Sequence, residues 1–437
     1  MEWTIRQVGQ QLREGKVTCV GLLDHYLSRI EALEPQIRAW VLVDARRARA
    51  EAAERDQELK RGYDRGALHG IPMGIKDIID VFDWPTSCGS SLWKQAYARQ
   101  DAPIVASLRH AGAVLIGKTV TTQFASFDPP PTRNPWNPGR TPGGSSSGSA
   151  AALAAGMCLA TLGSQTGGSI TRPASYCGVP ACKPTYGLVP LEGILPLAPT
   201  MDHPGPLATC IADVEIVLRT IAKPGVWDTG LASPEASPPP VLGRLRGLFD
   251  RLAQKPVRDM TDRFCAKLVQ QGASVVEVTL PVRFEEVLQH HRVIMAVEAA
   301  AYHGPRLARH PDDYGPRIRS LVEEGLNTPA PAYHLALQQQ SQLRDEMAEL
   351  FHQVDALIAP ATTSTAPDAA TTGDPAFNSP WSFTGLPVVS LPTEVADDGM
   401  PLGVQLIGPA LGEPDLFTQA TWVESQLGPR RQPALPS

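Results

Sequence analysis

The chain has 437 residues, of which 43% are apolar and 19% charged, and its formal net charge is −6. This composition is typical of a soluble globular protein, and the length fits two or three domains or one large α/β unit. The acidic balance argues against nucleic acid as the primary ligand. The seven cysteines include no CxxC pair, which argues against a zinc site or a disulfide framework and favours a reducing cytoplasm.

The amino terminus and the apolar runs of the chain argue against secretion and membrane insertion. The amino terminus is polar and lacks the apolar core of a signal peptide. The longest weakly polar run, residues 150–162, is too short to span a bilayer.

Residues 4–60 carry apolar side chains at helical spacing, so the chain is expected to open with helices. Short apolar runs then alternate with helical stretches. In one of them a helix is expected to end near Gly112 and a buried strand to follow. This alternation predicts an α/β fold with helices on the faces of a sheet.

The middle of the chain changes character twice. Residues 129–149 contain too much Pro, Gly, Asn and Ser for a helix or strand and are expected to form a long loop, followed by a small-residue helix. A Pro-rich break at 232–243 precedes long helices that continue to about Val354 and are interpreted as a cap. Strand-like runs after that point predict a return to the first sheet.

Two familiar motifs occur in the wrong context. Residues 112–119 satisfy GxxxxGK[ST], but the residues between the glycines are themselves a strand, which argues against a phosphate loop. Ser146 lies in a GxSxG pattern, but the upstream segment cannot form the strand that a nucleophile elbow requires. Four histidines that could serve as its base are interpreted mostly as surface or loop residues: His203, His290, His291 and His303.

Ser169 follows Thr166, Gly167 and Gly168, and no histidine lies near it in the sequence. The glycines could let consecutive backbone N–H groups converge on an oxyanion, or they could simply form a tight turn. The candidate base is Lys76, because its apolar neighbours would desolvate the amine and lower its pKa. Alternatively, Lys76 is a snorkelling side chain paired with Asp77. The hydroxyls of residues 145–147 could relay the proton.

These segments resemble the amidase signature family, and most closely its malonamidase-like branch. The resemblance extends over nearly the whole chain except the variable middle and is carried by GIPMGIKD, RNPWNPGRTPGGSSSGSAAALAAG, GSQTGGS, PASYCGVPACKPTYG, MDHPGPLA, VDALIAPATT and MPLGVQLIG. It implies that Ser169 is the nucleophile, Ser145 a bridging serine with a cis peptide bond, and Lys76 the base. It also implies an oxyanion hole made by the N–H groups of Thr166, Gly167, Gly168 and Ser169.

The chain departs from the family pattern on either side of the nucleophile. Gln165 stands where most members have Asp, and Thr171 stands where most have Arg. Arginine follows one position later, at Arg172, and in the resembling branch an arginine there is associated with a substrate carboxylate. Alternatively, Arg172 only braces the loop. Arg172, Gln165 and Gly144 are the expected substrate-binding residues.

The resemblance implies one α/β/α sandwich domain, residues 1–437, around a large mixed sheet. We expect a catalytic core over about 60–215, a pocket-shaping helical region over 232–354 and a return to the sheet over 355–430. The expected activity is hydrolysis of a small carboxamide by a cytoplasmic enzyme that needs no cofactor or metal and that forms a possible homodimer. The alternatives are an ammonia-producing glutaminase component of an amidotransferase and a catalytically inactive binding module.

Overall fold

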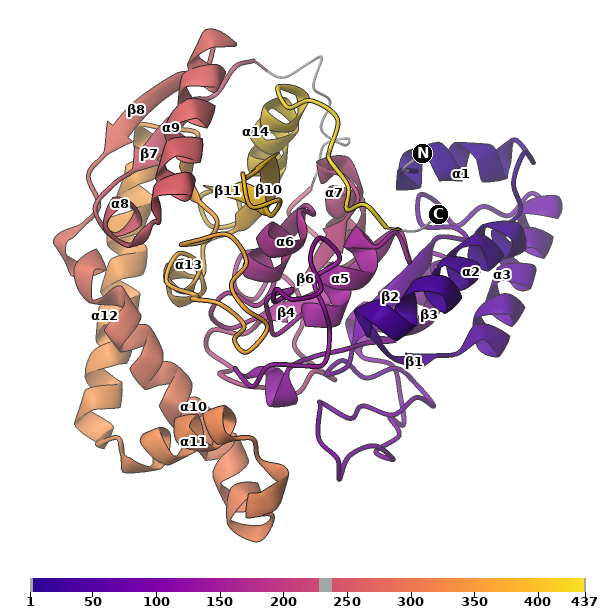
Figure 1. The fold of residues 1–437 in the computed structure, drawn as a ribbon, viewed down its shortest axis with the longest axis horizontal. Helices are drawn as coiled ribbons and strands as arrows, with labels where there is room; N and C mark the ends of the chain where they lie inside the picture. Colours follow the sequence, from indigo (N-terminus) through magenta and orange to yellow (C-terminus); the bar gives the residue numbers. More distant parts are fainter. Residues whose placement is uncertain (1–2, 228–237, 436–437) are drawn as a thin grey trace.

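The computed structural model describes residues 3–227 and 238–435. Eleven strands of these residues form one mixed sheet in the order β1-β3-β2-β4-β6-β5-β10-β11-β9-β7-β8 (Figure 1). The strands are β1 (Trp40–Val43), β2 (Pro72–Lys76), β3 (Val114–Thr119), β4 (Ala160–Gln165), β5 (Ala181–Lys183), β6 (His203–Ala208), β7 (Val241–Leu245), β8 (Ser274–Val278), β9 (Ala356–Pro360), β10 (Val388–Val395) and β11 (Pro401–Ile407).

Helices cover the sheet: α5 and α7 both pack on β4 and β6, while α6 and α14 both pack on β10 and β11. The helices are α1 (Ile5–Arg13), α2 (Cys19–Ile37), α3 (Ala45–Lys60), α4 (Pro103–His110), α5 (Ser147–Ala154), α6 (Thr171–Cys177), α7 (Ile211–Ile221), α8 (Leu248–Leu252), α9 (Lys255–Gln270), α10 (Val287–Arg309), α11 (Pro316–Asn327), α12 (Ala330–Ala348), α13 (Ser379–Thr384) and α14 (Glu413–Ser425). Among the described residues, no helix is long and apolar enough to cross a membrane.

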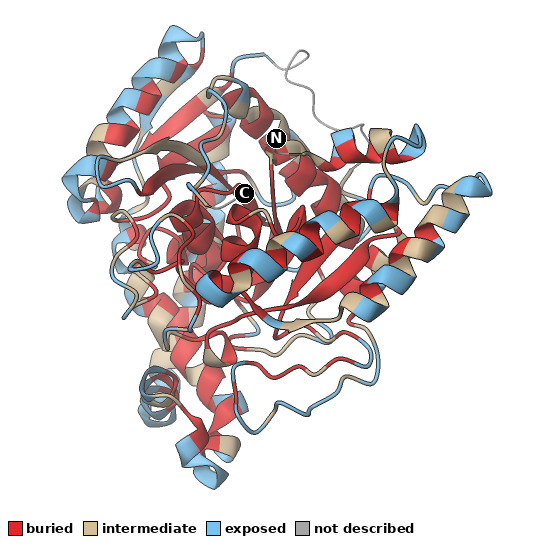
Figure 2. Cartoon of the chain, turned by 45° about the vertical axis from the view of Figure 1, so that its right-hand side comes forward, coloured by how far each residue is buried: buried red, intermediate tan, exposed pale blue. Residues whose placement is uncertain are grey.

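The opening of the chain is helical as expected, but it also contains a strand. Thr4 caps α1 by accepting from the N–H of Gln7, and α2 and α3 lie on the outer side of the buried strands in Figure 2. Between these two helices β1 pairs antiparallel with β3. Four residues are too few to show a strand period, which is why the sequence pattern did not reveal it.

The centre of the sheet brings two strand ends together. β2 runs parallel to both β3 and β4, so these strands end at one edge of the sheet, with Lys76 last in β2 and Gln165 last in β4. The GxxxxGK[ST] match overlaps β3 itself, which confirms that it is not a phosphate loop.

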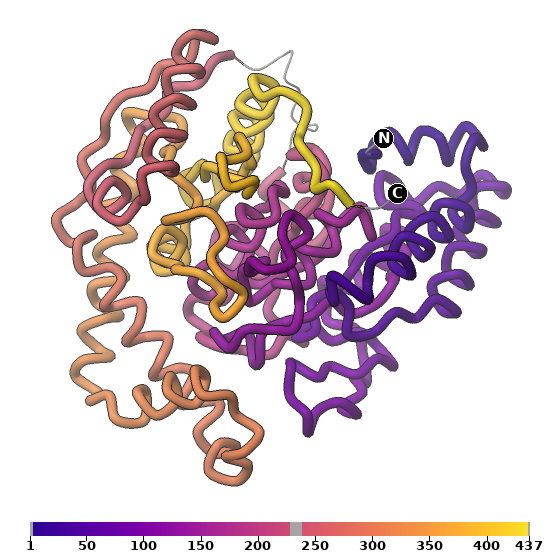
Figure 3. The backbone as a smooth tube through the Cα atoms, in the orientation of Figure 1, coloured from indigo at the N-terminus to yellow at the C-terminus, as the bar shows by residue number. Residues whose placement is uncertain are grey.

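The region after residue 237 mixes sheet and helix. β7 and β8 extend the sheet, α10, α11 and α12 form a helical arm at its far side, and β9 to β11 return to the sheet. The start of the expected break, residues 232–237, lies outside the described residues. The described ends of the chain are close together (Figure 3). Trp3 and Gln432, which are near those ends, line the same cavity.

Candidate active site

Lys76 lies fully buried at the end of β2, in contact with two serine hydroxyls. Its Nζ is 2.7 Å from Ser145 Oγ and 2.7 Å from Ser164 Oγ. Ser164 is the penultimate residue of β4, and the parallel pairing of Ile75 with Leu162 brings it beside Lys76. The hydroxyl contacts therefore follow from the register of the central strands.

Asp77 does not pair with Lys76. Its carboxylate accepts from Lys118 Nζ at 3.0 Å, and both side chains are fully buried. Among the described residues Lys76 forms no ion pair, and burial moves its pKa well below the ordinary value, against the smaller opposing effects of Asp202 and Cys88. The arrangement favours an uncharged amine, which can accept a proton.

The three serines of residues 145–147 make three different contacts. The peptide bond between Gly144 and Ser145 is cis, and Ser145 Oγ contacts Lys76. Ser146 Oγ instead donates to the carbonyl of Ser164 and accepts from its N–H, both at 3.2 Å. Ser147, the first residue of α5, donates from its Oγ to the carbonyl of Gly143. Ser146, the central serine of the GxSxG pattern, is therefore occupied by the β4 backbone.

Ser169 closes the turn that follows β4, and we call residues 166–169 the Thr166–Ser169 loop. The N–H of Ser146 donates to the carbonyl of Ser169 at 3.2 Å, which brings this loop against the serine-rich one. In the described part of the chain, the backbone N–H groups of Gly167, Gly168 and Ser169 have no acceptor within the protein. Such consecutive donors can bind an oxyanion.

Gln165 is engaged with the start of α6. Its side-chain oxygen accepts from the N–H groups of Ile170 and Thr171 and from the Thr171 hydroxyl, at 2.9 to 3.1 Å. Its amide nitrogen donates to Ser382 Oγ at 3.3 Å. These bonds use the side chain to hold the segment next to Ser169.

Arg172 is buried and only partly paired. Its Nη2 donates to the carbonyl of Gly144 at 2.8 Å and to Thr372 Oγ1 at 3.4 Å. Its Nε and Nη1 are buried without a hydrogen-bond partner among the described residues. Burial lowers the pKa of the guanidinium, while Tyr176 and Asp374 oppose that shift. The side chain thus braces the cis-bonded glycine and keeps two donors uncommitted.

The sequence did not identify two other contacts of the Thr166–Ser169 loop. Thr166 Oγ1 donates to the buried carboxylate of Asp202, and the Thr166 carbonyl accepts from His291 Nε2 at 2.9 Å. The interpretation of the four histidines as surface or loop residues was wrong, because all of them are buried. A helical period in 287–309 could have placed His291 on a buried face, but no local pattern names its partner.

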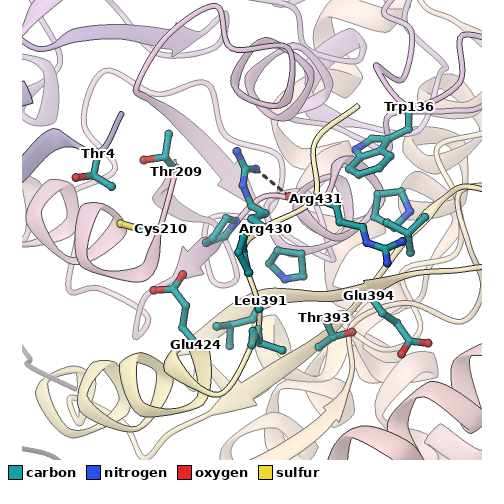
Figure 4. A pocket seen from close by; sticks show the side chains of 18 residues that line it. Thr4, Trp136, Thr209, Cys210, Leu391, Thr393, Glu394, Glu424, Arg430 and Arg431 are labelled. Atoms are coloured by element: carbon teal, nitrogen blue, oxygen red, sulfur yellow. Dashed lines mark hydrogen bonds between the residues drawn. The ribbon is translucent and has the colours of Figure 1, made fainter. Parts of the chain in front are cut away.

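Three aromatic residues do not form a pocket at the catalytic candidates. Trp381 is fully buried and stacks on Phe249 at a centroid distance of 5.9 Å, and Phe383 is also in the core. Trp136 lines a cavity of about 610 Å³ under the segment that follows α14, together with Arg430 and Glu424 (Figure 4). That cavity includes none of Lys76, Ser145 and Ser169. No group of three or more His, Cys, Asp or Glu in the described residues could hold a metal ion.

Comparison with known proteins identifies the family. The sequence model of the family described as Amidase matches residues 21–417. The chain belongs to the amidase family. It is thus an amide-hydrolysing enzyme, and its α/β/α sandwich is the amidase fold.

The amidase relatives include proteins of different names. The glutamyl-tRNA(Gln) amidotransferase A subunit of Synechococcus sp. (strain CC9605) is 34% identical over 470 residues, covering 96% of this chain and 95% of that one. Its counterpart of the same name in Roseiflexus castenholzii is 36% identical, covering 95% and 94%. Among solved structures, native peptide amidase from Stenotrophomonas maltophilia is 29% identical with a TM-score of 0.86, covering 100% and 99%.

A further solved structure comes from work on a vestigial protein complex and the origins of an s-triazine catabolic enzyme. It is 31% identical with a TM-score of 0.90, covering 98% of this chain and 100% of that one.

Proposed function

We propose that this amidase hydrolyses the C–N bond of a small carboxamide through an acyl-enzyme on Ser169. The observation that carries the proposal is the buried Lys76 amine, 2.7 Å from Ser145 Oγ and without an ion-pair partner among the described residues. Neutral Lys76 takes the proton of Ser145 while Ser145 takes that of Ser169. Ser169 Oγ then forms a bond to the carbonyl carbon, and the carbonyl oxygen becomes an oxyanion.

The second half of the cycle returns the proton. The N–H groups of the Thr166–Ser169 loop stabilise the oxyanion, and Gly167 and Gly168 contribute donors without side chains in the way. The C–N bond breaks as the leaving nitrogen receives the relayed proton and departs as ammonia or an amine. Water gives its proton to the same relay and attacks the acyl carbon, which releases the acid and restores Ser169.

Replacing Ser169 with Ala tests the nucleophile. The variant is expected to lose turnover and to lose the mass increase that a serine-directed phosphonate produces in the wild type. Ser145→Ala, a matched hydroxyl deletion one step away in the relay, is expected to slow labelling while leaving Ser169 as the labelled residue. Turnover retained in Ser169→Ala would refute the proposal.

We also propose that the substrate carries a carboxylate, which Arg172 binds. The buried guanidinium supports this role, because its Nε and Nη1 have no acceptor among the described residues and a charged guanidinium N–H forms a strong hydrogen bond with a carboxylate. Matched amides with and without the carboxylate should differ in KM about tenfold or more, and Arg172→Lys should reduce that ratio. Equal KM values would leave Arg172 only its bracing contacts with Gly144 and Thr372. Gln165, whose oxygen is already bonded, supports the site through α6.

A second candidate function is ammonia supply within an amidotransferase. It is favoured by the 34% and 36% identity to amidotransferase A subunits over at least 94% of each chain. Glutamine hydrolysis that requires a co-purified partner and tRNA would support it. Hydrolysis of simple amides by the chain alone would support the first function.

We propose that the enzyme acts in the cytoplasm as a homodimer and needs no cofactor. All seven cysteines are free thiols, which suits a reducing compartment. We further propose that about 60–215 form the catalytic core and that the helical region starting at about 232 shapes the pocket.

A further inference from the structure

Thr166, the first residue of the Thr166–Ser169 loop, is held from two sides. Its carbonyl accepts from His291 Nε2 at 2.9 Å, and its hydroxyl donates to Asp202. Thr166, His291 and Asp202 are all buried. No other side chain of the helical arm donates to this loop in the described residues.

Both contacts of Thr166 depend on side chains from one face of α10. Glu298 lies seven positions, or about two turns, after His291 on that helix, so the two side chains share a face. The Glu298 carboxylate accepts from the N–H and the hydroxyl of Thr200, at 3.0 and 2.6 Å. Thr200 belongs to the same short segment as Asp202, whose carboxylate also accepts from the N–H groups of Leu197 and Ala198.

We propose that α10 orients the oxyanion donors of the enzyme, with His291 as a direct positioning residue and Glu298 as an indirect one. The reason is the geometry of the peptide unit. The carbonyl of Thr166 and the N–H of Gly167 belong to one planar group and point in opposite directions. A donor that fixes the carbonyl on the α10 side therefore aims the Gly167 N–H toward the other side of the loop.

The same contact also strengthens the donor it orients. A hydrogen bond accepted by a carbonyl polarises the N–H of the same peptide unit, and this cooperativity matters most where water is excluded. His291 also lies beside the next residue of the loop, because a Cβ on Gly167 would be in ordinary van der Waals contact with its Cε1, at 3.4 Å. The inference rests on the proposed function, since it assigns the donors to an oxyanion.

Three substitutions on α10 test the direct contact. His291→Leu removes the donor, His291→Gln retains one, and His290→Leu is the matched control. His290 is also buried, but its Nε2 lies 3.3 Å from a carboxylate oxygen of Glu286, one turn earlier, and not from the Thr166–Ser169 loop. We expect kcat to fall by about 10- to 100-fold in His291→Leu, less than the 10²- to 10³-fold cost of deleting an oxyanion donor outright, with KM within about threefold.

His291→Gln should recover most of this loss, and His290→Leu should keep kcat within about threefold of wild type. The rate of phosphonate labelling at Ser169 should follow kcat, because the adduct carries the same developing negative charge. Unfolding midpoints of all three variants separate loss of fold from loss of orientation. Equal losses of kcat in His291→Leu and His290→Leu, or no recovery in His291→Gln, would overturn the inference.

Glu298→Ala tests the indirect contact in a double-mutant cycle with His291→Leu. If both side chains act on Thr166, the combined loss of kcat is smaller than the product of the single losses. If the loss of kcat in the double variant equals the product of the two single losses, Glu298 does not act through Thr166. Failure of these tests, with Ser169→Ala still inactive, would remove the role of α10 and leave the proposed function intact.

Discussion

The ends of β2 and β4 and the helix α10 contribute to the same loop in different ways. The strand ends hold a lysine amine and serine hydroxyls at hydrogen-bonding distance in the centre of the sheet. α10 belongs to an arm at the far side of the sheet, and only its inner face reaches the Thr166–Ser169 loop. The proposed proton transfer therefore depends on strand register, whereas the proposed donor orientation depends on packing between distant segments.

The largest expected effect is at the strand ends. Lys76→Met should lower kcat by about 10³-fold, within the 10²- to 10⁴-fold range of general-base catalysis. Wild-type activity should rise with pH through the lowered pKa of Lys76, because only the neutral amine accepts a proton, and this limb should be absent in the variant. A pH–rate profile of kcat measures it, and an unchanged limb in Lys76→Met would contradict the assignment.

Lys76 should also leave a sign in the pH dependence of stability. The unfolded chain keeps this side chain protonated up to about pH 10.4, whereas the folded chain loses the proton at lower pH. The unfolded state thus binds more protons between the two pKa values, so stability rises with pH in that window. Denaturant titrations should show the unfolding free energy of the wild type gaining on that of Lys76→Met as pH increases.

The next effect concerns the buried ion pair between Lys118 and Asp77, the residue that follows Lys76. Lys118→Met leaves the buried Asp77 carboxylate without its cation, and breaking such a pair costs about 3–5 kcal/mol of unfolding free energy. Lys255→Met, which removes an exposed lysine of the pair with Asp259, is the control and should leave the midpoint unchanged. Urea titration compares the two, and a similar midpoint for both variants would show that Asp77 finds another partner.

The sequence predicts the residues at the ends of β2 and β4 better than it predicts the contact made by α10. Lys76 among isoleucines and the TGGS turn are local patterns, so the candidate base and the loop could be located, and the family resemblance supplied Ser145. The contact of Ser164 with Lys76 needs the pairing of β2 with β4, which no local pattern specifies. His291 and Thr166 are 125 positions apart, and their contact depends on how the arm packs. Such long-range contacts follow from tertiary structure rather than from residue spacing.

The smallest expected effect lies in the arm itself, one residue beyond His291. Arg292 forms an ion pair with Glu324 of α11, and both side chains are about 40% exposed. Glu324→Gln should cost about 0.2–1 kcal/mol of unfolding free energy, because solvent and salt screen such pairs. Its kcat should equal that of the wild type, since in the described residues neither side chain forms a hydrogen bond with the Thr166–Ser169 loop. A loss of kcat comparable to that of His291→Leu would mean that general arm stability, and not the contact with Thr166, controls the rate.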